Sequence, residues 1–250
     1  MVFTTIAWSE SQDTSAVLTQ VAALADQHVT TSGDDILVPT FATNLGAVLA
    51  VGATISQAQM SSPSLRKSTL LDIGTLNIAA EPASPTSYAR LFETPRPLTA
   101  GEGLRALVAE SAAGAEQETV VAWLFGEPEA LPAGEIQTIR LTGTTTLGAF
   151  AWTLCTLTLS QQLEAGTYAI VGMRAVSAGA IAARLVISGA SHRPGVIAYD
   201  AASDIEDPIF RKGRLGSWGT FQHVYVPQVE FLSVSADTAE TVHLDVVKVA

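Results

Sequence analysis

The rhythm of β-forming segments after Gly33 constrains this chain more than any other feature. Runs of about 6 to 12 residues rich in Val, Ile, Leu, Thr and aromatic residues alternate with short breaks that contain Gly or Pro. No second amphipathic helix separates these runs, so a parallel sheet built from β-α-β units is improbable. The chain is therefore expected to be all-β. The expected strands are 36–41, 46–60, 69–77, 103–111, 119–126, 135–146, 150–160, 167–176, 181–188, 196–199, 229–235 and 241–249.

Several of these runs alternate between apolar and polar residues. In the run from 135 to 146, Ile139 and Leu141 fall on one side, and Thr138 and Arg140 fall on the other. Side chains of a strand point to opposite faces with a period of two, so this alternation indicates one buried and one solvated face. These segments are predicted to be half-buried antiparallel strands.

The region before Gly33 has the one helical signal of the sequence. Ser11 or Asp13 can cap a segment in which Ala16, Val17 and Val21, among other apolar residues, recur at helical spacing. The sequence predicts one short helix near residues 12–27, within an N-terminal arm of residues 1–32. Residues 33–250 are expected to form the β-sandwich.

A four-residue pattern, Leu-x-Ala-Gly, occurs three times. It spans 98–101, 131–134 and 163–166, at spacings of 33 and 32 residues, and each copy precedes an expected strand. The interpretation is a tight turn in which Gly adopts a positive φ and delivers the chain into a sheet beneath an apolar anchor. A solenoid is disfavoured because the residues between the turns show no further similarity.

Two long connections suggest how the strands are joined. Residues 81–101 carry four prolines, and residues 200–219 form a second expected loop. Long structured loops between two sheets are usual in jelly rolls, which are double-sheet sandwiches made from two Greek keys. The expected fold is a jelly-roll β-sandwich, either one elaborated barrel or two compact tandem barrels with a boundary near 127–134.

Composition restricts the function. Only 15% of the 250 residues are charged and 48% are hydrophobic, whereas a typical domain has roughly 25% charged residues. No run approaches the roughly 20 apolar residues of a membrane-spanning helix, and no basic residue precedes the apolar start of the chain, so a signal peptide is not expected. The net charge of −11 argues against direct nucleic-acid binding. The apolar excess favours burial of surface against partner subunits.

The sequence offers no convincing catalytic or cofactor site. The nucleophile elbow Gly-x-Ser-x-Gly is absent, and the four histidines are not spaced as a zinc site. His243 and Asp245 share a strand face, where a hydrogen-bonded pair is favoured over a metal site. Cys155 is the only cysteine, so internal disulfides are excluded. The glycine-rich stretch 213–219 lacks the Gly-Lys-Ser/Thr ending of a phosphate loop. We expect no enzyme activity and no cofactor.

The second half of the chain carries a family resemblance. The run 163–172, the Ala-rich strand up to Ser188, the turn 193–195 and the loop 213–221 before a final strand pair follow one another in this order. In strand and loop order this region, roughly the last 120 residues, resembles the jelly-roll shell proteins of icosahedral viruses, particularly bacteriophages. The resemblance implies a virion location, synthesis in the host cytoplasm and no catalytic residues. The Arg-rich arm of small RNA-virus members is absent here, which is compatible with an internal membrane beneath the shell.

The residues expected at subunit boundaries follow from these arguments. Arg211, Lys212 and Arg214 form the densest basic cluster and lie close to an acidic stretch at 204–207, so we expect ion pairs between them, within the chain or between subunits. Trp218 is expected to fill an apolar pocket in the same boundary region. Both chain ends are apolar, and Phe3 and Trp8 are expected to be held by contacts between subunits.

The expected function is a self-assembling capsid subunit that forms trimers or larger capsomers, with other virion proteins as further partners. The alternative is a β-sandwich module that binds carbohydrate or lipid, with exposed Trp and Tyr lining a groove. Trp123 and Trp152 lie in strand-like runs instead, which argues against such a platform.

Overall fold

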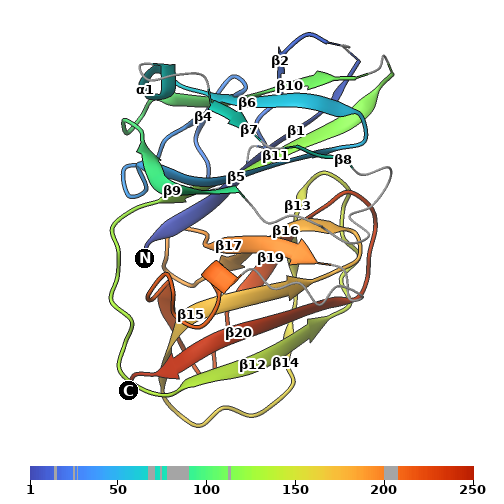
Figure 1. The fold of residues 1–250 in the computed structure, drawn as a ribbon. Helices are drawn as coiled ribbons and strands as arrows, with labels where there is room; N and C mark the ends of the chain where they lie inside the picture. The colour runs from blue at the N-terminus through green and yellow to red at the C-terminus, as the bar shows by residue number, and fades with distance from the viewer. Residues whose placement is uncertain are drawn as a thin grey trace. The chain divides into compact units, whose positions relative to one another are not determined.

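The computed structural model describes residues 1–13, 16–24, 26, 28–66, 71–73, 75–77, 90–111, 114–199 and 208–250. The chain divides into two compact units (Figure 1). The described residues of the N-terminal unit lie within 4–77 and 90–126, and those of the C-terminal unit are 1–3, 127–199 and 208–250. Expected and observed fold class agree, because nearly all regular structure is β.

The N-terminal unit contains two sheets. One has the order β1-β11-β5-β8 with β9 also paired to β5, and the other has the order β3-β4-β10-β6-β7 with β2 paired to β10. The elements are β1 (Phe3–Gln12), β2 (Thr19–Gln20), β3 (Thr31–Ser32), β4 (Asp35–Leu37), β5 (Asn44–Gly52), β6 (Ile55–Ser61), α1 (Pro63–Arg66), β7 (Leu71–Ile73), β8 (Thr75–Asn77), β9 (Arg90–Pro97), β10 (Gly103–Glu110) and β11 (Glu116–Phe125).

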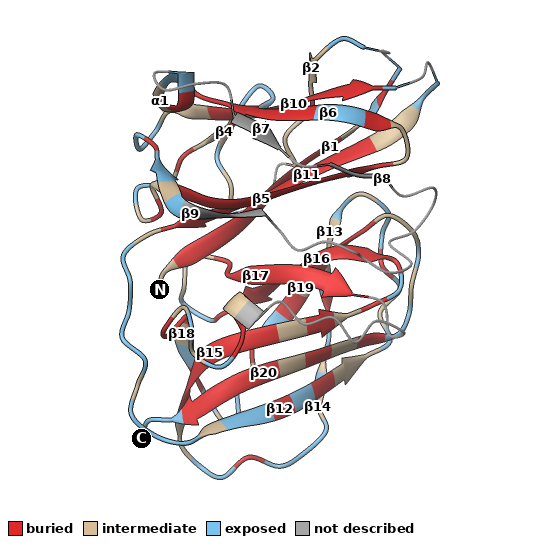
Figure 2. Cartoon of the chain, in the orientation of Figure 1, coloured by how far each residue is buried: buried red, intermediate tan, exposed pale blue. Residues whose placement is uncertain are grey.

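One hydrophobic core joins the two sheets of this unit. Alternate residues of β10 (Leu104, Ala106, Val108) and of β11 (for example Val120 and Leu124) belong to the same buried cluster. Trp8 lies in it with no exposed surface. Figure 2 shows buried residues along most of β1, β5 and β11. In β10 and β11 the core residues recur with a period of two, which places one apolar face of each sheet in this core.

The C-terminal unit contains one curled nine-stranded sheet. Its order is β13-β19-β16-β17-β15-β20-β12-β14, with β18 also paired to β15. The elements are β12 (Ile136–Gly143), β13 (Trp152–Cys155), β14 (Thr158–Leu159), β15 (Thr167–Val176), β16 (Ala180–Val186), β17 (Gly195–Tyr199), the 3₁₀-helix η1 (Pro208–Phe210), β18 (Gly219–Gln222), β19 (Gln228–Ser233) and β20 (Glu240–Lys248).

Both units use the same scheme of strand pairing. Take β1, β4, β5, β6, β7, β9, β10 and β11 in chain order: the first pairs with the eighth, the second with the seventh, the third with the sixth and the fourth with the fifth. In the C-terminal unit β12, β13, β15, β16, β17, β18, β19 and β20 repeat all four pairings. In each unit the third strand also pairs with the eighth and the fourth with the seventh. The chain doubles back along its own length twice.

The predicted N-terminal helix is wrong. β1 continues to Gln12, β2 occupies two residues of the predicted helix, and Ala16 has a φ of 59°. The backbone N–H of Val21 donates to Ala106 O, while Ser9 and Leu24 bond across to Ala22 and Ala7. Pairing with β1 and β10 satisfies these backbone groups, and burial of Val21 in the core outweighs a weak local helix preference. Among the described residues, the helices are α1 and η1.

The strand predictions succeed in the core and fail at two kinds of place. The predicted run 46–60 is broken at Ala53 and Thr54 into β5 and β6, and the predicted run 150–160 is broken into β13 and β14. Residues 69, 70 and 74 of the predicted run 69–77 lie outside the described residues. The Pro-rich connection 81–101 contains β9, and the second predicted loop ends in β18. A proline is tolerated on an edge strand such as β9, which explains why the prolines of this stretch led to the prediction of a loop.

The Leu-x-Ala-Gly turns have the predicted backbone. Gly101, Gly134 and Gly166 have φ values of 79°, 141° and 154°, and β10, β12 and β15 follow them. The apolar anchor is present in two of the three copies: Leu98 and Leu163 are buried, whereas Leu131 is 46% exposed. These three strands are not equivalent in the two units, so the pattern marks a local turn and not the repeat of the fold. No helix in the described part of the chain has the length and apolar character to span a membrane.

Candidate functional site

The loop that follows β17 in the C-terminal unit contains most of the predicted boundary residues. This loop contains η1 and, directly after it, Arg211. The Nε–H group of Arg211 donates to Asp245 Oδ2 at 2.8 Å, and a second N–H group of its guanidinium donates to Asp245 Oδ1 at 3.1 Å. The backbone N–H of Lys212 and the hydroxyl of Thr138 also donate to this carboxylate. Gly172 makes the approach possible, because a Cβ there would lie 2.6 Å from Asp245 Oδ2. The loop is therefore fixed to β12, β15 and β20.

The charge state of Asp245 follows from these contacts. Burial by itself would raise the pKa of this carboxyl, but the hydrogen bonds from Arg211, Lys212 and Thr138 and the charge of Arg211 outweigh burial and lower it. Asp245 has no exposed surface and Arg211 only 7%. The pair is a buried, doubly hydrogen-bonded ion pair.

An aromatic cluster supports the same loop. The Phe3 and Trp218 rings meet edge to face at a centroid distance of 4.9 Å, and Phe210 lies 6.2 Å from Phe3 and 6.3 Å from Trp218. All three rings are buried. Edge-to-face rings add to the free energy gained from burial. Trp218 is buried against the rings of Phe3 and Phe210, in agreement with its predicted packing into an apolar pocket.

The other two cations of the cluster point outward. Lys212 and Arg214 are exposed on either side of Gly213, and Lys212 has a φ of 51°. Gly213 packs on Leu131, since a Cβ there would come within 2.4 Å of Leu131 Cδ1. The exposed Leu131, Lys212 and Arg214 together form what we call the loop patch.

The predicted boundary residues therefore separate into two groups. Arg211 pairs with Asp245 inside the chain, and the acidic stretch 204–207 lies outside the described residues. Phe3 and Trp218 pack inside the C-terminal unit, and Trp8 packs inside the N-terminal core. A boundary role for these three aromatic residues stays a prediction, whereas Lys212 and Arg214 have the exposure that such a role requires.

A second exposed apolar group lies at one end of the C-terminal unit. Val224 and Tyr225 are 62% and 71% exposed in the connection after β18, and Val249 is 42% exposed after β20. The backbone joins them, because Val249 N–H donates to Thr167 O and Thr167 pairs with Gln222 in β18. Sequence reasoning missed this end patch, since two apolar residues in a loop carry no periodic signal.

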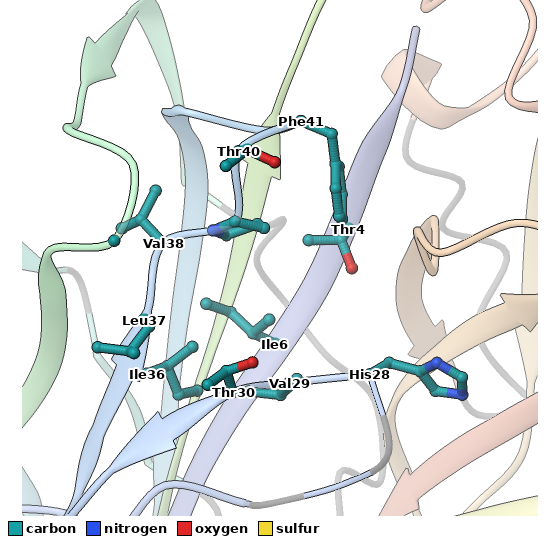
Figure 3. A pocket seen from close by; sticks show the side chains of 12 residues that line it. Thr4, Ile6, His28, Val29, Thr30, Ile36, Leu37, Val38, Thr40 and Phe41 are labelled. Atoms are coloured by element: carbon teal, nitrogen blue, oxygen red, sulfur yellow. The ribbon is translucent and has the colours of Figure 1, made fainter.

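The N-terminal unit has a half-open pocket of about 340 Å³ (Figure 3). Ile6, Ile36, Val38 and Phe41 provide much of its apolar lining, with His28 among the polar residues. Threonines 4, 30 and 40 also line it. Pockets of this size with an apolar lining and a few polar groups are typical of small-ligand sites. No sequence pattern indicates this pocket, because its residues come from separate segments of the chain.

Three further candidates for chemistry are engaged in the fold. His192 Nε2 lies 2.7 Å from Trp218 O, and His223 Nδ1 accepts from Gly166 N–H. Burial raises the pKa of the Cys155 thiol to about 11, which keeps it protonated and unreactive. No cluster of three or more His, Cys, Asp or Glu side chains suited to a metal ion occurs in the part of the chain that the structure describes.

Comparison with known proteins identifies no relative: no family model, curated protein or solved structure matches the chain.

Proposed function

We propose that the chain is a self-assembling shell subunit made of two tandem jelly rolls, and that the shell is a viral capsid. The observation that carries the proposal is the pairing of first with eighth, second with seventh, third with sixth and fourth with fifth strand in both units. A chain folded back along its length and rolled into two sheets gives the double Greek key of a jelly roll. Of the two predicted arrangements, this favours two compact barrels over one elaborated barrel.

The surface supports a structural role. Shell subunits need exposed contact groups on rigid elements, and the loop patch is held rigidly by the buried Arg211–Asp245 pair. The end patch adds exposed apolar side chains at the ends of paired strands. Apolar and aromatic groups of this kind dominate the energy of protein interfaces. Copies of the chain are therefore the proposed partners, in trimers or larger rings.

Location and other partners are part of the proposal. The proposal rests here on the resemblance of the sequence to bacteriophage shell proteins in strand and loop order, and the net charge of −11 argues against genome neutralisation by this chain. The proposed location is the virion, with genome contact left to other virion proteins or to a membrane inside the shell. Catalysis and cofactors have no part in the proposal.

Sedimentation velocity and negative-stain microscopy of the purified chain test the proposal. Trimers or larger rings are expected, and a monomer at high concentration would contradict it. Replacing Lys212 and Arg214 with Ser should weaken assembly and make it more sensitive to salt, because exposed charges act through screened fields. Arg96→Ser, which removes an exposed cation from β9, is the matched control.

A ligand-binding module is the second candidate, favoured by the pocket of the N-terminal unit. Jelly rolls also occur in lectins, so the proposed fold allows this function. Thr40→Trp places a large ring at an exposed position of the lining, and Thr146→Trp is an exposed control in the other unit. Binding of a fluorescent fatty acid or of a glycan that Thr40→Trp abolishes and Thr146→Trp leaves intact would favour this candidate.

A further inference from the structure

Two carboxyl groups lie at one end of the apolar core of the N-terminal unit. In β10 the inward-facing series Leu104, Ala106 and Val108 belongs to the core, and the next inward position is Glu110. In β11 the inward series that includes Val120 and Leu124 is preceded by Glu118. Glu110 is 1% exposed and Glu118 has no exposed surface. Each sheet therefore contributes one acidic side chain to the same end of the core.

Glu118 is held in a tight, water-poor position. A Cβ on Gly52, the last residue of β5, would lie 1.5 Å from Glu118 Oε2, so the carboxyl group occupies the space that a side chain would otherwise fill. Neither of its oxygens has a donor in strict hydrogen-bonding geometry among the described residues, but the hydroxyl and backbone N–H of Thr54 lie near enough to act on it. The Thr54 hydroxyl also lies 3.5 Å from Glu110 Oε1, so the connection between β5 and β6 lies beside both acids.

The charges around Glu118 have one sign. The groups that act on it are Glu110 of β10 and Glu116 of its own strand, and no cation is among them in the described part of the chain. Glu10 of β1 is the next acid on this side, and its carboxylate accepts from the N–H of Ala22 and from Gln12 Nε2. Burial first, then the charges of Glu110 and Glu116, raise the pKa of Glu118 to about 7, while Thr54 lowers it in part.

We infer that Glu110 and Glu118 form a proton-operated lock that closes this end of the N-terminal sandwich at acidic pH and loosens it above neutrality. With a proton on Glu118 the pair carries at most one charge and the ends of β5, β10 and β11 stay packed. Loss of that proton gives Glu118 a negative charge beside Glu110 and Glu116, where the described residues supply Glu118 with no cation, and separation of these strand ends lets water reach the carboxylate. The lock works within one chain and does not depend on assembly.

The direction of the pH effect is fixed by linkage. The folded-state pKa of Glu118, about 7, lies above the ordinary value of 4.5, so the fold favours the protonated form. Stability from this group is complete below pH 4.5 and is lost as the pH rises to about 7. Between pH 6 and pH 8 the equilibrium constant for opening is expected to rise by about tenfold.

Hydrogen exchange of the full chain, read by mass spectrometry and corrected for the intrinsic pH dependence, tests the lock. Peptides from β5, β10 and β11 should show the tenfold loss of protection, whereas β15 and β20 should change less. Glu118→Gln should abolish the change and give slower exchange than wild type at pH 8. Asp34→Asn removes an exposed charge from the turn between β3 and β4 of the same unit and should keep the wild-type response.

Three results would overturn the inference. The first is a wild-type profile that is flat between pH 6 and pH 8, and the second is a Glu118→Gln variant with an unaltered profile. The third is restoration of protection at pH 8 by millimolar Ca²⁺, which would assign the pair to cation binding. If Glu118→Gln does not fold, Glu110→Gln serves instead: removing the neighbouring charge lowers the pKa of Glu118 and should shrink the tenfold change.

Discussion

The two units use the same strand pairing but treat a buried acid on their last strand in opposite ways. In the C-terminal unit Asp245 of β20 has a bidentate Arg211 and two further donors, and its pKa is lowered. In the N-terminal unit Glu118 of β11 faces Glu110, and its pKa is raised. Asp245 points away from the core residues Leu244 and Val246, whereas Glu118 points into the core with Val120. Backbone pairing therefore sets the topology without setting the electrostatics.

The comparison also shows how each unit is stabilised in the region of its buried acid. A paired buried acid gives a rigid loop, because removing either partner leaves an uncompensated charge. An unpaired buried acid gives a site whose stability depends on pH. The loop patch therefore lies in the C-terminal unit, whose buried acid is paired, and the lock lies in the N-terminal unit, whose buried acid makes stability depend on pH.

The largest expected effect is the loss of the ion pair. Asp245→Ala should lower the free energy of unfolding of the C-terminal unit by about 3 to 5 kcal/mol, because Arg211 is left charged and buried. Urea unfolding followed by hydrogen exchange of β15 and β20 measures it. Lys212→Ala, which removes an exposed side chain of the same loop, is the control and should change stability by less than about 0.5 kcal/mol. Equal effects of the two variants would remove the distinction between the units.

Adding one methyl group beside each acid should also distinguish the two units, through its effect on the free energy of unfolding. Gly52→Ala and Gly172→Ala should each cost about 1 to 3 kcal/mol through overpacking. Glu118→Ala should relieve Gly52→Ala, because the three atoms nearest the added methyl group all belong to the Glu118 side chain. Asp245→Ala should not relieve Gly172→Ala, since Lys212 N and Arg211 Cα lie 2.9 and 3.0 Å from the added atom. Double-mutant cycles by urea unfolding measure both couplings.

Lowering the pH should destabilise the C-terminal unit first, whereas raising the pH should destabilise the N-terminal unit first. The folded-state pKa of Asp245 is lowered, so its contribution is present above the ordinary value of 3.8 and is lost as the pH falls below it. Glu118 is protonated in the native state there and favours the fold. Exchange measured from pH 5 down to pH 3 should therefore expose β20 before β11, and simultaneous loss would argue against the assignment.

The smallest effect concerns the exposed loop patch. Leu131→Ser should change unfolding by less than about 0.5 kcal/mol, since surface substitutions rarely exceed that. Leu98→Ser, at the buried equivalent position of another Leu-x-Ala-Gly turn, is the matched contrast and should cost several times more. Thermal unfolding of the two variants gives the ratio. A similar cost at both positions would show that Leu131 is an anchor after all.

The local features of the fold could be predicted from the sequence. Alternation along β12 specified which residues face inward, and the glycines of the Leu-x-Ala-Gly turns specified positive φ, because both depend on neighbours in the chain. The absence of a second helical pattern specified an all-β chain. For the candidate site, sequence reasoning located the cationic loop and the burial of Trp218.

The other features required the three-dimensional fold. The apparent helix of residues 12–27 gave way to pairing with β1 and β10, and the partner of Arg211 is Asp245, 34 positions away. The repeated strand pairing has no counterpart in sequence periodicity, since it consists of backbone hydrogen bonds that any residue except proline can donate. Glu118 and Glu110 meet only because two sheets close over one core. Contacts between distant segments depend on the global fold, and no local pattern encodes them.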